Sequence, residues 1–155
     1  MNLNSKRSER VVKTFQELPM SQKDEIIAVL KDLFSDKADF ALLFGSWARD
    51  EARITADSDV DCGVFLNEDI PVEILYGELP TDFYSRTGRE LDIVRLNDAD
   101  IIIASQIVMT GEPVFVNSEE RFDAYRVKIL SLYFDFKKSR KIIEDRILVK
   151  PRYGQ

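Results

Sequence analysis

The stretch FGSWARDEARITADSDVDCGVF, residues 44–65, contains the pattern that decides the fold. A Gly-Ser pair ends one apolar run, and Asp57, Asp59 and Asp61 come shortly before or within a second apolar run. Carboxylates held so close together repel one another, and burial of any one of them adds to that cost. The pattern therefore predicts that a cation lies among these carboxylates.

The length and charge of the chain narrow the possible classes. With 155 residues, of which 45% are hydrophobic, the chain is long enough for one domain with a sizeable core. We expect a single domain over 1–155, with a core from about 21 to 116 and a long C-terminal helix over about 119–149. The formal net charge of -6 disfavours a general nucleic-acid-binding protein, which carries a basic surface, so we expect no direct nucleic-acid binding.

The chain contains no histidine and one cysteine, Cys62. The missing histidine excludes Ser-His-Asp and Cys-His catalysis and histidine metal ligands, which leaves carboxylates, hydroxyls and bound metal for any chemistry. Cys62 cannot form an internal disulfide and is expected to be a small core residue in a reducing compartment. Because no stretch approaches the length of a signal-peptide core or a membrane span, we expect a cytoplasmic protein without membrane contact.

Helical and strand patterns alternate along the chain. The apolar runs predict strands over 40–44, 60–66, 91–96 and 113–116. Periodic segments predict helices at about 9–18, over 47–52 and over 119–149, and another that begins after an N-cap at Ser21. Part of 71–88 is predicted to be helical, with a break near Pro80 and a cap at Gly88. A further helix is predicted from an N-cap at Asn97 or Asp98 to Gly111. This alternation is typical of a small α/β sandwich.

The aspartates fall at the start of predicted strands. Residues two apart in a strand point to the same face, so Asp59 and Asp61 project together while Val60 points to the opposite layer. If the strand over 91–96 pairs beside the strand over 60–66, Asp92 joins them. Three oxygen donors without nitrogen or sulfur suit hard cations, Mg²⁺ first, and two such ions about 4 Å apart can clamp an in-line phosphoryl displacement.

The Gly-Ser pair supplies a phosphate site next to these carboxylates. Gly45 lets the backbone approach a ligand closely, and the helix that follows offers free N–H groups. Ser46 adds a hydroxyl donor, and Arg49 lies about one turn further on and adds a positive charge. A phosphate site beside a metal cluster indicates nucleotide chemistry.

Each feature taken alone has a simpler explanation. A Gly-Ser pair is usually a turn, and an Asp-x-Asp pair is usually solvated surface. We expect Asp57 to cap its turn locally, Glu90 to face solvent and Trp47 to pack in the core. The functional interpretation rests on the order of the parts: strand, Gly-Ser, helix, Asp-x-Asp on a strand, and a lone aspartate on a third strand.

This order resembles the polymerase-β-like nucleotidyltransferase superfamily. Its G-S…D-x-D signature stands here as Gly45, Ser46, Asp59 and Asp61, with Asp92 as the third carboxylate. Over about 40–115 the chain resembles the minimal nucleotidyltransferases, in particular the MntA-type antitoxins that are partners of HepT-type HEPN toxins. The stretch ARIT, residues 52–55, reads as a lengthened loop.

The resemblance implies a nucleotidyltransferase fold, a small mixed β-sheet with flanking helices. It implies that Gly45 and Ser46 hold the triphosphate of ATP, that Asp59 and Asp61 bind two Mg²⁺ ions, and that Asp92 completes the metal site and helps deprotonate the attacking hydroxyl. The reaction would transfer AMP to a tyrosine of a HEPN toxin within a hetero-oligomer. Two alternatives stay open: a small-molecule nucleotidyltransferase, for example of aminoglycosides, and a non-catalytic antitoxin that acts by occlusion.

The C-terminal helix carries more apolar residues than one sheet contact needs. One face combines five of them, Phe122, Tyr125, Ile129, Leu132 and Phe136, and the basic KKSRK segment, 137–141, follows. We expect this helix to be the docking surface for the partner. The competing explanation is that its first half is simply buried on two sides within the domain.

Overall fold

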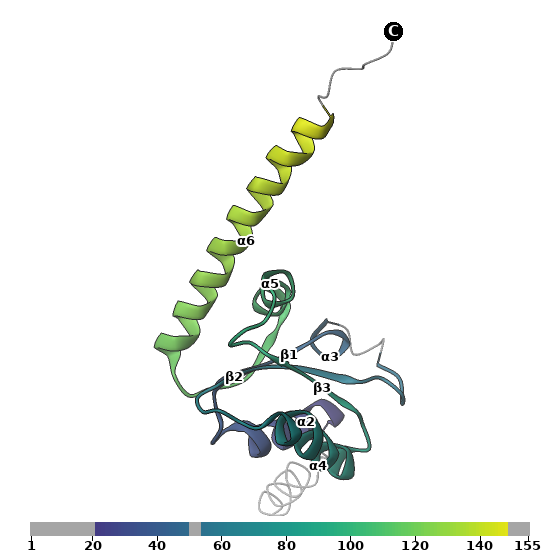
Figure 1. The fold of residues 1–155 in the computed structure, drawn as a ribbon. Coiled ribbons are helices and arrows are strands. Elements are labelled where there is room, and N and C mark those ends of the chain that lie inside the picture. Colours follow the sequence, from purple (N-terminus) through teal and green to yellow (C-terminus); the bar gives the residue numbers. More distant parts are fainter. Residues whose placement is uncertain (1–20, 50–53, 149–155) are drawn as a thin grey trace, which may run out of the picture.

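The computed structural model describes residues 21–49 and 54–148, so the helix expected at about 9–18 lies outside the described residues. Along the chain the elements are α2 (Gln22–Phe34), β1 (Ala38–Phe44), α3 (Ser46–Arg49), β2 (Val60–Leu66), η2 (Ile74–Glu78), α4 (Leu79–Thr87), β3 (Leu91–Arg95), α5 (Ile101–Thr110), β4 (Glu112–Val116) and α6 (Glu119–Leu148). Figure 1 shows α6 as a long helix that extends well beyond the rest of the fold.

The four strands form one mixed sheet in the order β3-β2-β1-β4. β1 is antiparallel to both β2 and β4, whereas β2 and β3 are parallel. The expected small mixed sheet with flanking helices is therefore confirmed. β1 is buried along its whole length except at Phe44, which explains why it reads as a continuous apolar run.

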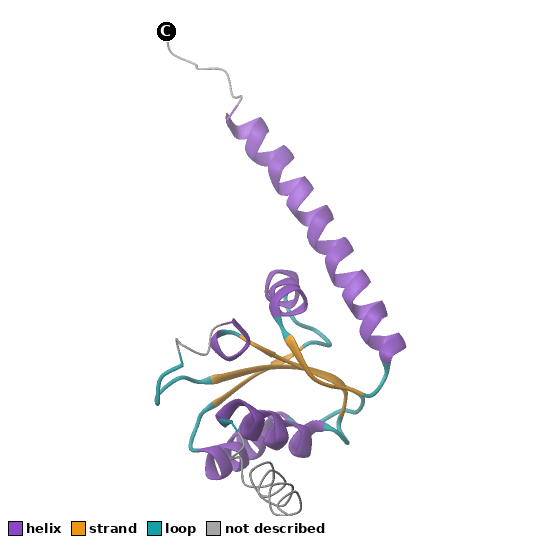
Figure 2. Cartoon of the chain, turned by 180° about the vertical axis from the view of Figure 1, so that it is seen from behind, coloured by secondary structure: helices purple, strands orange, loops and turns teal. Residues whose placement is uncertain are grey.

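Helices cover the sheet on both faces (Figure 2). On one face α2, η2 and α4 enclose a core that includes Leu30, Phe34, Val60 and Phe83. On the other face α5 and the first turns of α6 enclose a second core around Phe40. The alternation of the sheet residues between these two cores decides which face of the sheet each aspartate occupies. None of the helices within the described ranges is long and apolar enough to cross a membrane.

Several predicted helix ends are confirmed, and one predicted break is wrong. Ser21 caps α2, because its Oγ accepts a hydrogen bond from Asp24 N at 3.1 Å. Gly88 ends α4 in the left-handed conformation, with φ at 71°. Pro80 does not interrupt the helix: the π-turn η2 runs directly into α4, where Pro80 occupies its first turn. The wider π-turn accommodates a residue that has no N–H and whose ring crowds the preceding turn.

The start of α5 also differs from the prediction. The N-cap is Asp100, which accepts a hydrogen bond from Ile102 N at 2.8 Å, and not Asn97 or Asp98. Asn97 instead bonds to the end of β2: its Nδ2 donates to Leu66 O at 2.9 Å, and its Oδ1 accepts from Leu66 N at 2.8 Å. The amide of Asn97 satisfies both backbone groups of Leu66, so it extends the sheet ladder by one step.

Candidate active site

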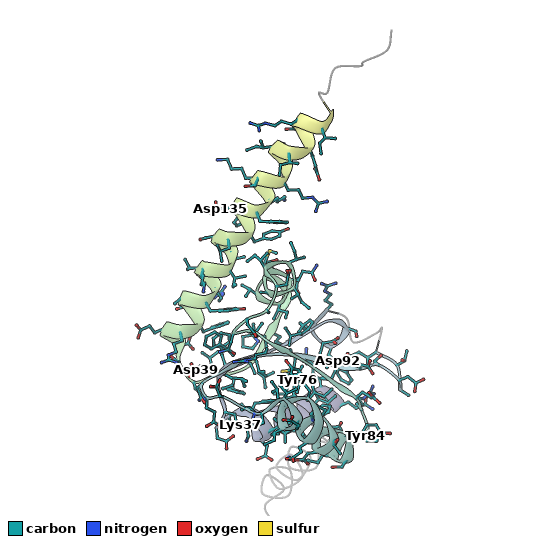
Figure 3. The ribbon with its side chains drawn as sticks, in the orientation of Figure 1. Lys37, Asp39, Tyr76, Tyr84, Asp92 and Asp135 are labelled. Atoms are coloured by element: carbon teal, nitrogen blue, oxygen red, sulfur yellow. The ribbon has the colours of Figure 1, made fainter. Side chains whose placement is uncertain are left out.

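The parallel pairing of β2 with β3 brings two of the predicted carboxylates together. Val60 pairs with Leu91, and Asp61 pairs with Asp92 in the next step of the register. Val60 and Leu91 both point into the core under α2 and α4. Because side chains alternate along each strand, Asp61 and Asp92 lie on the opposite face, at the end of the sheet that carries α3. Figure 3 shows Asp92 at this end.

The charges of Asp59 and Asp92 act on Asp61. Asp59 and Asp92 are exposed, whereas Asp61 is half-buried. The pKa of Asp61 is raised above its ordinary value of 3.8, first by burial and then by the negative charges of Asp92 and Asp59. Asp61 is thus the carboxylate at which the repulsion predicted from the sequence is concentrated, and a cation at this site would relieve it.

Gly45 lies directly against Asp61. Phe44, the last residue of β1, pairs with Asp61, and Gly45 then turns the chain with φ at 71°. A Cβ atom built on Gly45 would overlap Asp61 Oδ2. Glycine is therefore needed here twice, for the left-handed backbone and for the space that the carboxylate occupies. The turn and the carboxylate form one packed unit.

The helix after the Gly-Ser turn is short. α3 contains a single turn that begins at Ser46, in which Ala48 N and Arg49 N both donate to Gly45 O at 3.2 Å. The first N–H groups of a helix have no intrahelical carbonyl partner, so Ser46 and Trp47 can present theirs to an anion. Arg49 is exposed at the last residue of α3. Of the predicted segment 47–52, residues 50–52 lie outside the described ranges.

The donor set fits a hard cation. All three side chains offer carboxylate oxygens, and Asp61 feels the charge of the other two. Within 21–49 and 54–148, no group of three or more His, Cys, Asp or Glu side chains is spaced to hold a metal ion as the side chains stand. A cation held by all three carboxylates would therefore require Asp59 and Asp92 to turn toward Asp61. Both side chains are exposed, and exposed side chains change rotamer rapidly.

Sequence reasoning missed Arg89. Its Nη1 donates to the carbonyl oxygens of Thr55 at 2.8 Å and Ser58 at 3.1 Å, and its guanidinium lies 4.7 Å from the ring centroid of Trp47. Arg89 therefore links the turn before Asp59 to the helix that contains Ser46. The sequence around Arg89 does not predict this link, because Arg89 is distant in sequence from the turn and from α3, and only the folding of the chain brings them together.

The remaining residues behave largely as expected. Cys62 is fully buried, and burial raises its thiol pKa to about 12, so it is not a nucleophile. Trp47 is buried and Glu90 is exposed. Among the described residues, the hydrogen bonds within the turn at Asp57 are made by Ser58, whose Oγ accepts from Thr55 N at 2.8 Å, and Asp57 is exposed. Local capping by Asp57 stays a prediction, because residues 50–53 of the same loop lie outside the described ranges.

Residues 24–120 match the family model described as Polymerase beta, Nucleotidyltransferase. No curated protein matches the chain. Among solved structures, a chain of a toxin–antitoxin complex with AMP-PNP superposes with a TM-score of 0.64 at 23% identity, over 82% of this chain and 98% of that one. A chain from a complex of a tri-AMPylated Shewanella oneidensis HEPN toxin with its MNT antitoxin gives 0.60 at 22% identity, over 83% and 97%.

A third similar chain comes from an MntA toxin–antitoxin pair in which two aspartates, two positions apart, are each replaced by glutamate. Its TM-score is 0.63 at 22% identity, and the match covers 82% of this chain and 98% of that one. At these identities the likeness concerns the fold. Almost the whole length of each similar chain is matched.

Proposed function

The chain belongs to the polymerase β nucleotidyltransferase family, and on that premise we propose that it is an antitoxin that transfers AMP from ATP to a tyrosine hydroxyl of a cognate HEPN-type toxin. The chain would act in the cytoplasm as a single domain in complex with that toxin. The toxin–antitoxin complexes among its structural neighbours, one with AMP-PNP and one with an AMPylated toxin, support this choice over a small-molecule acceptor.

One observation carries the proposal: the Gly45 turn packs against Asp61, which pairs across the strands with Asp92. The backbone of the Gly-Ser turn and the carboxylates therefore share one end of the sheet. We propose that Asp59, Asp61 and Asp92 hold Mg²⁺, in two ions, and that Gly45, Ser46 and Arg49 hold the triphosphate. Bound Mg²⁺ would supply charge neutralisation for the phosphates and lower the pKa of the attacking hydroxyl.

The chemistry follows from these positions. The acceptor oxygen attacks the α-phosphorus of ATP, a new O–P bond forms, and the bond from the α-phosphorus to the bridging oxygen of the β-phosphate breaks. Pyrophosphate leaves with the electron pair of that bond. Asp92 accepts the proton of the hydroxyl, while Ser46 and the backbone N–H groups of the Gly-Ser turn keep the leaving phosphates in line.

The test is to incubate the chain and a candidate HEPN-type partner with ATP labelled at the α- or the γ-phosphate. Adenylyl transfer predicts that the α-label becomes covalently attached to the partner and that the γ-label appears only in pyrophosphate. Attachment of the γ-label would instead show phosphoryl transfer. A partner that is neutralised without taking up either label would identify occlusion as the mechanism and contradict the proposal.

A further inference from the structure

The first turns of α6 are fixed to the domain. Phe122, Tyr125 and Ile129 are buried in the core under α5. Tyr125 Oη donates to Leu96 O at 2.9 Å, and Arg121 pairs with Asp39 at 2.8 Å. These contacts set the direction of the helix, so the part beyond Ile129 is held in a defined position and not merely tethered.

The apolar face continues beyond the buried part. Positions three or four residues apart along the same face hold exposed apolar side chains: Leu132 (48% exposed), Phe136 (43%), Ile143 (57%) and Ile147 (61%). Ser139 is the one interruption between Phe136 and Ile143. We call these four residues the distal stripe. Figures 1 and 3 show that this part of α6 runs past α5 and away from the sheet. Such spacing is typical of a helix that packs against another helix.

A groove lies where the distal stripe begins. Ile102 of α5 and two aromatic residues of α6 contribute the apolar walls of a cavity of about 450 Å³. Charged side chains of α6 line the rest of it, three basic and one acidic: Lys137, Arg140, Lys141 and Glu144. The apolar wall of this groove meets the distal stripe at Phe136, and the stripe continues along α6 beyond it. A monomer rarely exposes such a surface unless another molecule covers it.

The charges beside the stripe indicate what covers it. Residues 137–141 contain four basic side chains, of which Arg140 pairs with Glu144 at 2.8 Å, in a chain of net charge -6. Two copies could pair their stripes either in parallel or in antiparallel orientation about the midpoint. Either arrangement sets 137–141 of one copy against 137–141 of the other, so like charges meet and self-pairing is disfavoured. An occupant with acidic residues beside its apolar face has the complementary charge.

We infer that the distal stripe and its groove bind an amphipathic helix of another protein, with acidic residues flanking the apolar face of that helix. The inference rests on the proposed function only in one respect: it takes the protein that binds the distal stripe to be the acceptor of AMP. Docking through α6 then holds the acceptor while its hydroxyl reaches the carboxylates at the sheet end.

The test uses the full chain and a designed helical peptide of about four heptads, with Leu and Ile at the a and d positions and Glu at e and g. A twin peptide carries Lys in place of Glu. One variant changes the distal stripe, Phe136→Gln with Ile143→Gln. Its matched control makes the same two exchanges elsewhere on the exposed part of α6, Phe134→Gln with Ile142→Gln, where the side chains are 60% and 46% exposed.

Fluorescence anisotropy of the labelled peptides gives the affinities. We expect the acidic peptide to bind the unchanged chain at least about tenfold more tightly than its basic twin, and more weakly as salt is added. The stripe variant should lose at least about tenfold in affinity, and the control variant should bind like the unchanged chain. Equal losses in both variants, a preference for the basic peptide, or binding of neither peptide would overturn the inference.

Two further measurements separate the possible failures. Sedimentation that shows a dimer of the chain, dissolved by the stripe variant but not by its control, would identify a second copy as the occupant and overturn the inference. Binding of ATP with Mg²⁺ should be the same in the stripe variant and the unchanged chain, because the carboxylates lie elsewhere. If the chain transfers no AMP but the peptide results hold, the proposed function fails and the docking surface stands.

Discussion

Asp61 is destabilising to the folded domain in the absence of a cation. Its raised pKa means that the folded state binds its proton more tightly than the unfolded state does, so its contribution to stability falls as pH rises from 3.8 through the raised pKa. Asp61→Asn should therefore raise the melting temperature at neutral pH without divalent ions, and the gain should shrink near pH 3. Thermal melts of both chains across this pH range check the prediction.

Mg²⁺ should stabilise the unchanged chain more than the Asp61→Asn variant, because only the unchanged chain has the Asp61 carboxylate as a ligand. It should raise the melting temperature of the unchanged chain, and do so much less in Asp61→Asn. A variant that is less stable than the unchanged chain at pH 7, or one that responds equally to Mg²⁺, would contradict the assignment of Asp61 to the cation site.

Gly45 and Gly88 provide a matched pair of substitutions. Both have φ at 71°, but a Cβ on Gly45 would overlap Asp61 whereas a Cβ on Gly88 meets nothing within 4 Å. Gly88→Ala should lower the free energy of unfolding by about 1 kcal/mol, because alanine adopts the left-handed conformation less readily than glycine. Gly45→Ala should lower the free energy of unfolding by more than Gly88→Ala does, because Asp61 must also move to make room for the Cβ atom. The same displacement of Asp61 should abolish AMP transfer. Equal destabilisation in chemical unfolding, with transfer retained in both variants, would show that the contact between Gly45 and Asp61 is unimportant.

Arg89 is a positioning residue for the turn before Asp59. Arg89→Ala should lower kcat for AMP transfer by about tenfold or more, because Asp59 loses its defined position, and should raise the Mg²⁺ concentration that gives half-maximal rate. The control is Arg86→Ala on α4, which removes an exposed ion pair with Asp32 and should change little. If Arg89→Ala lowers thermal stability but leaves kcat and the Mg²⁺ dependence unchanged, Arg89 has a purely structural role.

At the scale of the elements, sequence reasoning worked where one local rule dominates. The strand over 60–66 was predicted with the bounds that β2 has, because its apolar residues are covered on both faces. Sequence reasoning failed where tertiary contacts determine the structure. Asn97 has a side chain that is common at N-caps, but its amide makes two hydrogen bonds to Leu66 instead. Pro80 normally predicts a break, and only the preceding π-turn makes it compatible with a continuous helix.

The candidate site was predictable in part for the same reason. Asp59 and Asp61 are close in sequence, and the charge of Asp59 acts on Asp61. Asp59 precedes β2, however, so alternation along the strand fixes the face of Asp61 alone. The pairing of Asp92 with Asp61 needed the assumption that β3 lies beside β2, which the register supports. The contact of Gly45 with Asp61 and the links made by Arg89 depend on the path of the backbone, and periodicity contains no information about that path.

The helix α6 divides into a buried first part and an exposed distal part. Of the residues that truncation after Phe136 removes, those with described burial, 137–147, are all exposed, and the last buried residue of α6 is Ile129. We expect the truncated chain to melt within about 2 °C of the full chain and to bind ATP, but to modify its partner poorly. Partner modification at the full rate would contradict the docking role of the distal part, and loss of folding would show that the whole helix belongs to the core.

At the scale of the whole molecule, the carboxylates and the anchor of α6 lie at different ends of the sheet. Asp39, which anchors α6 through Arg121, lies near the start of β1, whereas Asp61 pairs with Phe44 at its end. Figure 3 shows Asp39 and Asp92 at opposite ends of the sheet. Substitutions at the carboxylates therefore leave the anchor of α6 intact, so the claim about the carboxylates can be tested separately from the claim about the partner.

The most direct test of the account is label transfer from α-labelled ATP by the double variant Asp59→Asn with Asp61→Asn. Folding should survive, because removing the charges relieves the repulsion around Asp61. The account predicts a well-folded chain that transfers no AMP to its partner at any Mg²⁺ or Mn²⁺ concentration, beside an unchanged chain whose transfer depends on the metal. Transfer by the double variant at the rate of the unchanged chain would contradict the assignment of these carboxylates to catalysis.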